Sequence, residues 1–282
     1  MKKDLNSSIN AWSDAEDKTT QIYLDEIKLM DEMIESVKNN YQLNRMTLFR
    51  ALCFGVLIIC RDNAKAGLLL VKENLIHQVH YISRNMFEMI VNLCFIDNED
   101  SKRQELVERF FEYRIVHAFK ALKTMKKYPS IPQSVRTEQK DADIEEGYND
   151  FRNKYKDANE KINLSKWSGK TLPDMINCIK DAELRENLMT GYEIMNETNN
   201  RFLHLSYDYV RTVIEGEYER VTDYQARYTQ LSSLMVSADL TIKKYFIHFQ
   251  KNRPAFKIKY DDIDKRHAQV QMEVVTLLKS LE

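Results

Sequence analysis

Glycine and proline are too scarce in this chain for folds that depend on many tight turns. The 282 residues include 6 Gly and 4 Pro. Both residues turn strands and end helices, and hairpin-rich folds use many more of them. No stretch alternates apolar and polar side chains, as a half-buried strand does, over more than a few residues. The sequence therefore predicts an all-α fold, a bundle of long antiparallel helices with short connections.

Apolar residues recur at helical spacing along most of the chain, and 43% hydrophobic residues suffice for a sizeable core. The pattern predicts a single helical domain over residues 1–282, with its core at about 18–127 and 167–250. A segment at about 134–166 is dense in charge and poor in aliphatics, so we expect an exposed helical insertion there. "NRPAF" interrupts the pattern, and a closing helix follows at about 260–282.

Charge and cysteine usage bear on partners and compartment. Lys and Arg number 42 against 43 Asp and Glu, a balance that does not indicate nucleic-acid or membrane binding by net charge. The longest uncharged apolar run, "ALCFGVLIIC", is far shorter than the ~20 residues that span a bilayer. The N-terminus has no apolar signal-peptide core. The cysteines lie in apolar surroundings without a C-x-x-C pair, as in a reducing compartment: Cys53, Cys60, Cys94 and Cys178. We expect a cytoplasmic protein.

The stretch "ENLIHQVHYISRNMFEMIVNLCFI", residues 73–96, combines a strongly apolar helix pattern with ionisable groups. We expect a helix over about 64–96, preceded by a break near Asp62 and Asn63 and ended by "DNED". At ~100° per residue, its ionisable side chains fall within about 80° of arc. They are Glu73, His77, His80, Arg84 and Glu88.

This polar stripe has two interpretations. An amphipathic helix with a solvated face would explain it. However, the stripe has two His and no Lys, and apolar residues continue it at both ends: Ala66 and Leu70 before it, Val91 and Phe95 after it. That composition favours an enclosed pocket, and it makes the stripe a candidate site.

Three motifs resemble a known bacterial family, DUF5677. They are the Arg-x-x-x-Glu helix "SRNMFEMIVNLCFID", the loop "KWSGKTLPDM" and the later "GYEIMNETNNRFLH". The resemblance spans roughly residues 45–210, and its matching positions are Arg84, Glu88, Trp167 and His204. The usual tyrosine and serine before the final histidine have no clear counterparts here, where Asn196, Asn199 and Asn200 stand. The resemblance carries no established chemistry.

The chain is also distantly similar to the HEPN helical bundles, which include metal-independent ribonucleases of toxin and antiphage systems. The Arg-to-His motif of those enzymes is missing. Arg84 and Asn85 are followed by no histidine at the motif's distance, and "RFLH" is too short. An arginine and a histidine from different helices would have to replace it.

The first functional hypothesis is a ribonuclease of a bacterial defence or toxin module. His204 or His80 would take a proton from a ribose 2′-hydroxyl, because the pKa of histidine lies near neutral pH. Arg84 would stabilise charge on the phosphate, and Glu88 would orient it. His77, Trp167 and Asn200 would support the site. This hypothesis needs no cofactor, and its partners would be RNA and another protein of the defence system.

The second hypothesis is a metal site. Glu73, His77 and His80 form E-x-x-x-H-x-x-H on one helical face, and carboxylate and imidazole groups are common ligands of transition metals. Helical bundles build di-iron sites from paired Glu-x-x-His helices. A second copy of such a helix is not found in the sequence.

The third hypothesis is a binding or sensor module without chemistry. Arg84 and Glu88, four residues apart, would form a buried ion-pair network that fixes helix register or binds a small anionic ligand. The charged segment at 134–166 would then be a surface for a partner. Long amphipathic helices such as residues 222–250 often pair, which makes a homodimer an expectation that rests on this helix type alone.

Overall fold

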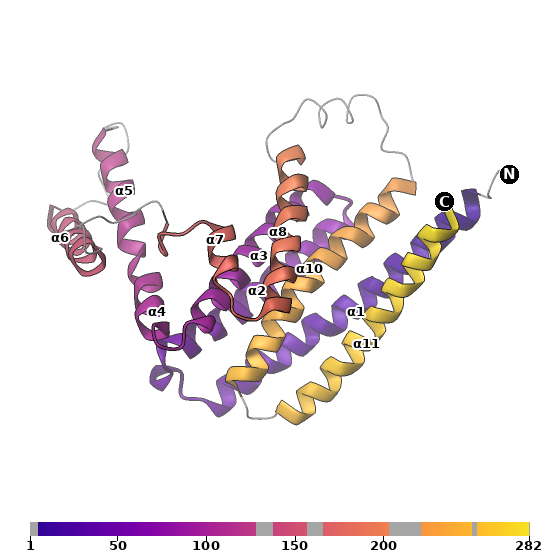
Figure 1. Ribbon diagram of the computed structural model, residues 1–282, viewed down its shortest axis with the longest axis horizontal. Helices are drawn as coiled ribbons and strands as arrows, with labels where there is room; N and C mark the ends of the chain where they lie inside the picture. Colours follow the sequence, from indigo (N-terminus) through magenta and orange to yellow (C-terminus); the bar gives the residue numbers. More distant parts are fainter. Residues whose placement is uncertain (1–4, 128–137, 157–165, 203–220, 250–252, 282) are drawn as a thin grey trace. The chain divides into compact units, whose positions relative to one another are not determined.

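The computed structural model describes residues 5–127, 138–156, 166–202, 221–249 and 253–281 (Figure 1). Every regular element in these ranges is helical and none is a strand, which confirms the predicted all-α fold. Contacts group the chain into two compact units, residues 1–93 with 181–282, and residues 94–180. The single domain stays a prediction, and each unit is described by itself.

The first unit is built on three mutually packed helices, α1, α2 and α10. α1 spans Leu5–Asn40, α2 spans Leu48–Lys72 and α10 spans Val221–His248. A short 3-10 helix, Leu43–Arg45, links α1 to α2. α3 (Ile76–Asn98), α8 (Ala182–Phe202) and α11 (Arg253–Leu281) complete the unit, although the last residues of α3 belong to the second unit.

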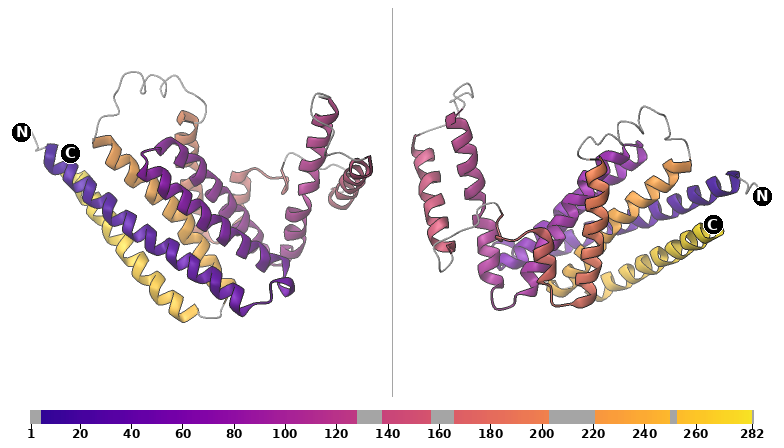
Figure 2. Two further views of the ribbon diagram at one scale, coloured as in Figure 1. Left: turned by 180° about the vertical axis from the view of Figure 1, so that it is seen from behind. Right: turned by 45° about the horizontal axis from the view of Figure 1, so that its top comes forward.

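α11 runs antiparallel along α1, as the two views of Figure 2 show. A row of buried residues on α1 follows the alternating three- and four-residue spacing of a coiled-coil seam. The row that has this spacing consists of Trp12, Ala15, Thr19, Ile22, Glu26, Leu29 and Met33, and other buried residues of α1 lie beside it. α11 repeats the pattern with Phe256, Tyr260, Ile263, Val270 and Val274, and half-buried His267 falls in the same seam. The heptad repeat explains why these helices pair along most of their lengths.

Three ion pairs along this seam share one register. Lys18 pairs with Glu273 at 2.7 Å, Asp25 with Arg266 at 2.9 Å, and Glu32 with Lys259. Each pair lies seven residues from the next on both helices. A slip by one heptad would place Asp25 opposite Glu273, or Lys18 opposite Arg266, and so bring like charges together. Exposed pairs of this kind contribute about 0–1 kcal/mol each, so they specify register more than stability.

The break between α2 and α3 lies at Glu73–Leu75, so the predicted helix over about 64–96 was wrong in its start. Asn74 has φ = 56°, a left-handed conformation that asparagine tolerates better than most residues. The Leu75 N–H donates to the Leu70 carbonyl at 2.8 Å, and the Asn74 N–H to the Val71 carbonyl at 3.0 Å. These two bonds satisfy the last carbonyls of α2.

The expected break at Asp62 and Asn63 is not present because both side chains lie on outer faces of a continuous helix. Asp62 pairs with Arg61, and the Asn63 side chain donates to the Asn85 side chain at 3.1 Å. Polar residues at such positions do not interrupt the backbone bonds of a helix. Glu73 consequently lies outside α3, and the apolar residues Ala66 and Leu70 do not close the polar stripe.

The second unit contains the end of α3, α4 (Arg103–Glu112), α5 (Arg114–Lys127), α6 (Glu138–Tyr155) and α7 (Leu172–Asn177). α6 is the described part of the charged segment and packs on α5, where Phe119 and Tyr148 stack with centroids 3.7 Å apart. α7 begins with a reciprocal cap between Thr171 and Asp174, and Pro173 lies in its first turn as predicted.

Two further boundaries bear on the predictions. The closing helix begins at Arg253 rather than near residue 260, because Pro254 falls in its first turn, where a missing N–H costs nothing. The predicted turn at Ser168 and Gly169 is confirmed, with φ = 71° at Gly169. In the described part of the chain, no helix combines the length and apolarity needed to cross a membrane.

Candidate functional site

Arg84 and Glu88 form the expected ion pair on α3, but at the surface of the protein. The Arg84 Nε donates to the Glu88 Oε1 at 2.8 Å. Each side chain is 44% exposed. This arrangement differs from the buried network of the third hypothesis, because water reaches both groups. The pair stabilises the helix by only about 0.2–0.5 kcal/mol.

His80 occupies a different environment from Arg84, although one helical turn separates them. His80 is buried, and its Nε2 lies 3.4 Å from the Gln230 side-chain nitrogen on α10. Ser83 is also buried. The polar stripe is therefore not one surface: its start faces the interior between α3 and α10, and its end faces solvent. A base at His80 would have no direct access to a large substrate in this conformation.

Several predicted site residues lie beyond what the structure describes. His204 lies outside the described residues. His77 belongs to α3 and Asn200 to α8, but neither side chain is described. The roles of these residues stay predictions. Glu73 is exposed and precedes α3.

The metal hypothesis also stays a prediction, because the His77 side chain is outside the described set. Among the side chains that are described, no group of three His, Cys, Asp or Glu is arranged to hold a metal ion. The helix break also changes the geometry of the proposed set, since Glu73 does not share a continuous helix with His80.

Trp167 lies in the second unit, where it is buried in an aromatic cluster. Its ring centroid lies 5.2 Å from that of Phe110 and 6.1 Å from that of Phe95, both in edge-on geometry. Such contacts stabilise packing and do not by themselves indicate a ligand site. The described contacts of Trp167 account for its burial.

The exposed face of α3 gathers several groups suited to recognition. Tyr81 is 58% exposed and lies one turn before Arg84. Asn85 follows Arg84 and accepts a hydrogen bond from Asn63 of α2 at 3.1 Å. Only the Nε of Arg84 is engaged, and its guanidinium has no second partner among the described residues. A planar guanidinium with free Nη groups matches the oxygens of a phosphate or carboxylate.

A second polar cluster, which the sequence reasoning missed, lies in the seam of α1, α10 and α11. Glu26 is 2% exposed, and its Oε2 has no hydrogen-bond partner among the described residues. Burial raises the pKa of the Glu26 carboxyl well above its usual range, and the carboxylates of Asp239 and Asp264 raise it further. This environment therefore favours the protonated form of Glu26.

The groups on α10 and α11 surround this carboxyl. Asp239 accepts a hydrogen bond from the Tyr260 hydroxyl and pairs with Lys243 at 2.8 Å. Burial and this hydrogen bond raise the pKa of Tyr260. Burial lowers the pKa of His267. On α2, burial raises the pKa of the Cys60 thiol to about 12.

One sequence signal could have found this cluster. Glu26 stands at a seam position of the heptad pattern, four residues after Ile22 and seven before Met33. A charged residue at such a position is rarely fully buried without a partner. The apolar spacing of this segment predicted the helix. The charged residue within that spacing, Glu26, was the signal for a buried polar cluster.

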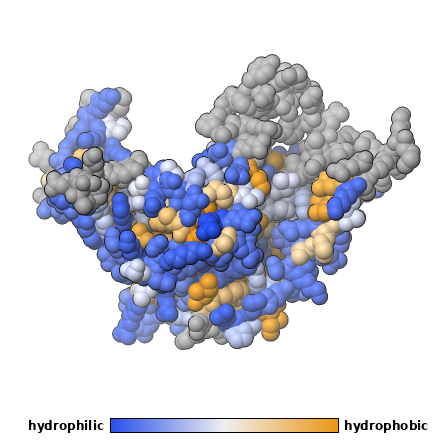
Figure 3. All heavy atoms as spheres, in the orientation of Figure 1, coloured by the Kyte–Doolittle hydropathy of each residue, from blue (hydrophilic) through white to orange (hydrophobic). Residues whose placement is uncertain are grey.

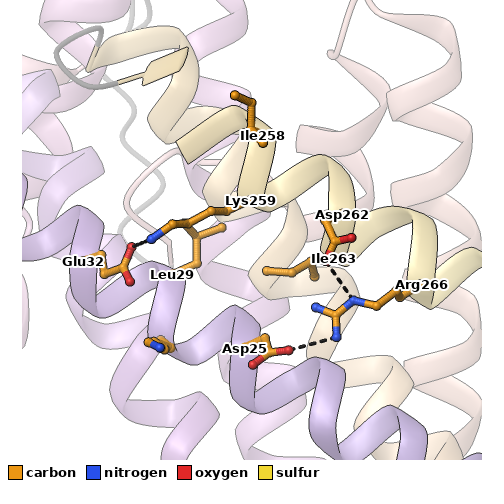
Figure 4. Close-up of a pocket in the computed structure, with 9 residues that line it drawn as sticks. Asp25, Leu29, Glu32, Ile258, Lys259, Asp262, Ile263 and Arg266 are labelled. Carbon is orange, nitrogen blue, oxygen red and sulfur yellow. Dashed lines mark hydrogen bonds and ion pairs between the residues drawn. The ribbon is translucent and has the colours of Figure 1, made fainter. Parts of the chain in front are cut away.

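A groove of about 430 Å³ follows the outer side of the α1–α11 seam (Figure 4). Arg266 lies between Asp25, at 2.9 Å, and Asp262, at 3.0 Å, and Lys259 reaches Glu32. Leu29, Ile258 and Ile263 contribute the apolar part of the lining. Most of the charged groups here already neutralise one another, so an ionic ligand would have to compete with them.

Comparison with known protein families supplies the remaining observation. A family model matches residues 50–208, more than half of the chain. The chain belongs to the family of unknown function DUF5677. The match confirms the resemblance carried by the motifs around Arg84 and Trp167. No curated protein and no solved structure matches the chain. The DUF5677 segment includes α2, α3 and α8 but neither α1 nor α11, so Glu26 and most of its neighbours lie outside it.

Proposed function

We propose that the chain is a non-catalytic helical binding module whose α3 surface recognises a phosphate-bearing ligand. The observation that carries the proposal is the state of Arg84. Glu88 orients its guanidinium through Nε at 2.8 Å, while no described residue engages the Nη groups. An oriented guanidinium loses little freedom when it binds an anion, and it can form two parallel hydrogen bonds to phosphate.

The surroundings of Arg84 support a ligand that also has a flat or polar part. Tyr81 offers an exposed ring, and Asn63 and Asn85 offer amide groups on adjacent helices. Aromatic rings stack on nucleobases with little dependence on sequence. A nucleotide or a short single strand of RNA therefore fits this face better than a bare anion does.

The proposal is tested by titrating the protein with a fluorescent RNA decamer in EDTA. Arg84→Ala should weaken binding roughly tenfold or more, the loss of one charge-assisted contact. Arg84→Lys should restore only part of the affinity, since an ammonium group lacks the planar fork. Arg50→Ala serves as the control, because Arg50 is an exposed arginine on α2. Equal affinities in Arg84→Ala and Arg50→Ala would contradict the proposal.

A metal-independent ribonuclease is the second candidate, and the same face supports it. Glu88 orients Arg84, as that hypothesis requires, and Arg84 is open to a phosphate. The decamer experiment separates the two candidates, because cleavage in EDTA favours the enzyme and binding without cleavage favours the module. Loss of cleavage in both Arg84→Ala and His204→Ala would assign the reaction to these residues. Cleavage that persists in both variants would remove them from it.

Homodimerisation through α10 is a further part of the proposal. Val236 and Ile247, 11 residues apart on this helix, are 48% and 53% exposed. Apolar patches appear between polar areas on the face shown in Figure 3. Sedimentation equilibrium should give a dimer that Ile247→Glu dissociates. A monomer in the unsubstituted protein at all concentrations would contradict this part.

A further inference from the structure

The seam that attaches α11 contains a buried carboxyl group. Glu26 lies at a core position of α1, is 2% exposed, and its Oε2 receives no hydrogen bond from the described residues. Among those residues no cation pairs with it. A buried carboxylate without a partner is far less stable than a buried carboxylic acid, since only the charged form loses strong hydration.

None of the charged and titratable groups around Glu26 stabilises its carboxylate form. They are Tyr23 on its own helix, Cys60 on α2, Asp239 with its partner Lys243 on α10, and Tyr260, Asp264 and His267 on α11. The one cation among them, Lys243, is engaged by Asp239 at 2.8 Å. The Asp239 and Asp264 carboxylates repel a second negative charge.

α11 is the helix whose attachment can depend on the protonation of Glu26. α1, α2 and α10 each pack on the other two, whereas α11 packs mainly along α1. Its outward side chains include exposed Ile258 and Met272, 73% and 65% accessible. The ion pairs across its seam are exposed and therefore weak. Separation of α11 would leave the three-helix core in place.

We propose that Glu26 is a proton-operated latch, which holds α11 against α1 and α10 while its carboxyl is protonated and releases α11 when the carboxyl ionises. On ionisation the proton passes to solvent, and the carboxylate gains hydration only if the seam opens. Release would expose the α1 side of the seam, including Ile22, Leu29 and Met33. The latch is independent of the α3 surface and of any ligand bound there.

The direction of the pH response follows from the neighbours. The pKa of Glu26 is raised in the folded protein, so docking of α11 weakens as pH rises through that raised pKa. The lowered pKa of His267 has the opposite effect, but only below its ordinary value of about 6.5. The raised pKa values of Tyr23, Tyr260 and Cys60 leave these acids protonated at moderately alkaline pH. Glu26 is therefore the group of this cluster that controls the pH dependence of α11 docking above pH ~6.5.

Hydrogen exchange followed by mass spectrometry tests the latch on the full chain. Protection factors, corrected for the intrinsic pH dependence of exchange, are compared between α11 and α2 at pH 6.5, 7.5 and 8.5. One proton released on opening should lower the protection of α11 by up to about tenfold per pH unit. Protection of α2 should stay constant. Glu26→Gln, which keeps the shape but cannot ionise, should remove the pH dependence of α11.

Glu32→Gln is the matched control, because Glu32 lies on the same helix and pairs with Lys259 at the surface. It should retain the pH response of the unsubstituted protein. If Glu26→Gln does not fold, Glu26→Met replaces it as a non-ionisable side chain of similar length. An equal pH response in the unsubstituted protein and the Glu26 variant would overturn the latch. Simultaneous loss of protection in α2 and α11 would also overturn it.

Discussion

Arg84 and Glu26 show how the surroundings of an ionisable side chain determine whether its charge is available. Arg84 has a partner and is 44% exposed, so its charge costs little and can meet a ligand. Glu26 is buried and its Oε2 has no hydrogen-bond partner among the described residues, so ionisation of the carboxyl is disfavoured. Both are single ionisable residues on long helices. Their spacing in the sequence placed them on helical faces, but only the packing of other helices separates the two roles.

Loss of the α3 ion pair should leave stability almost unchanged. Arg84→Ala and Glu88→Ala are each expected to alter the free energy of unfolding by at most about 0.5 kcal/mol, because exposed pairs contribute little. Urea denaturation followed by circular dichroism measures the change. A loss of several kcal/mol in both variants would mean that the pair holds the fold, against the recognition role.

At the scale of helices, a glycine lets α2 and α10 approach closely. A Cβ on Gly67 would lie 2.6 Å from the Cδ1 of Leu234, a fully buried side chain. A Cβ on Gly55, in the same helix, would meet no atom within 4 Å. Neither glycine has a positive φ, so the two positions differ in space rather than in backbone conformation.

The two glycines should therefore respond with opposite signs. Gly67→Ala is expected to destabilise the protein by about 1–3 kcal/mol through overpacking. Gly55→Ala should stabilise it by up to about 1 kcal/mol, because alanine favours the helix. Thermal and urea unfolding of both variants would check the difference. Equal effects at the two positions would show that the contact with Leu234 relaxes easily.

The turn between α2 and α3 gives a second prediction at this scale. Asn74→Ala should cost about 1–2 kcal/mol, because alanine lacks the tolerance of asparagine for the left-handed conformation. Asn74→Gly should be neutral or stabilising, since glycine adopts it readily. If both substitutions were equally harmful in urea denaturation, the asparagine side chain rather than its backbone would end α2.

For the whole molecule, composition and periodicity predicted the fold class and most helices. The prediction of a helix break at Asp62 and Asn63 was wrong, because polar side chains occur both on the outer face of a helix and at helix ends. Only the backbone hydrogen bonds distinguish these two cases. The α1–α11 seam joins residues more than 200 positions apart, such as Lys18 and Glu273. The apolar spacing within one helix does not identify the helix that packs against it. The motif around Arg84 predicted the family and the ion pair, but not its exposure.

The free energy of unfolding of the whole protein should depend on pH because of Glu26. A raised folded pKa means that its contribution is fully present below about pH 4.5 and is lost as pH rises through the folded value. Over that range one proton corresponds to a slope of about 1.4 kcal/mol per pH unit at most. Urea denaturation between pH 6.5 and 8.5 should show a decline that is absent in Glu26→Gln. Parallel curves would assign the decline to other groups.

The regular spacing of the three seam ion pairs limits how the length of this helix pair can change. An insertion of one or two residues in α1 between Lys18 and Glu32 would rotate the later charges away from Arg266 and Lys259 and turn Leu29 and Met33 out of the seam. An insertion of seven in both helices would preserve every partner. Homologous proteins that keep the α1–α11 pair should therefore vary in length here by whole heptads, with the added residues matched between two segments at opposite ends of the chain.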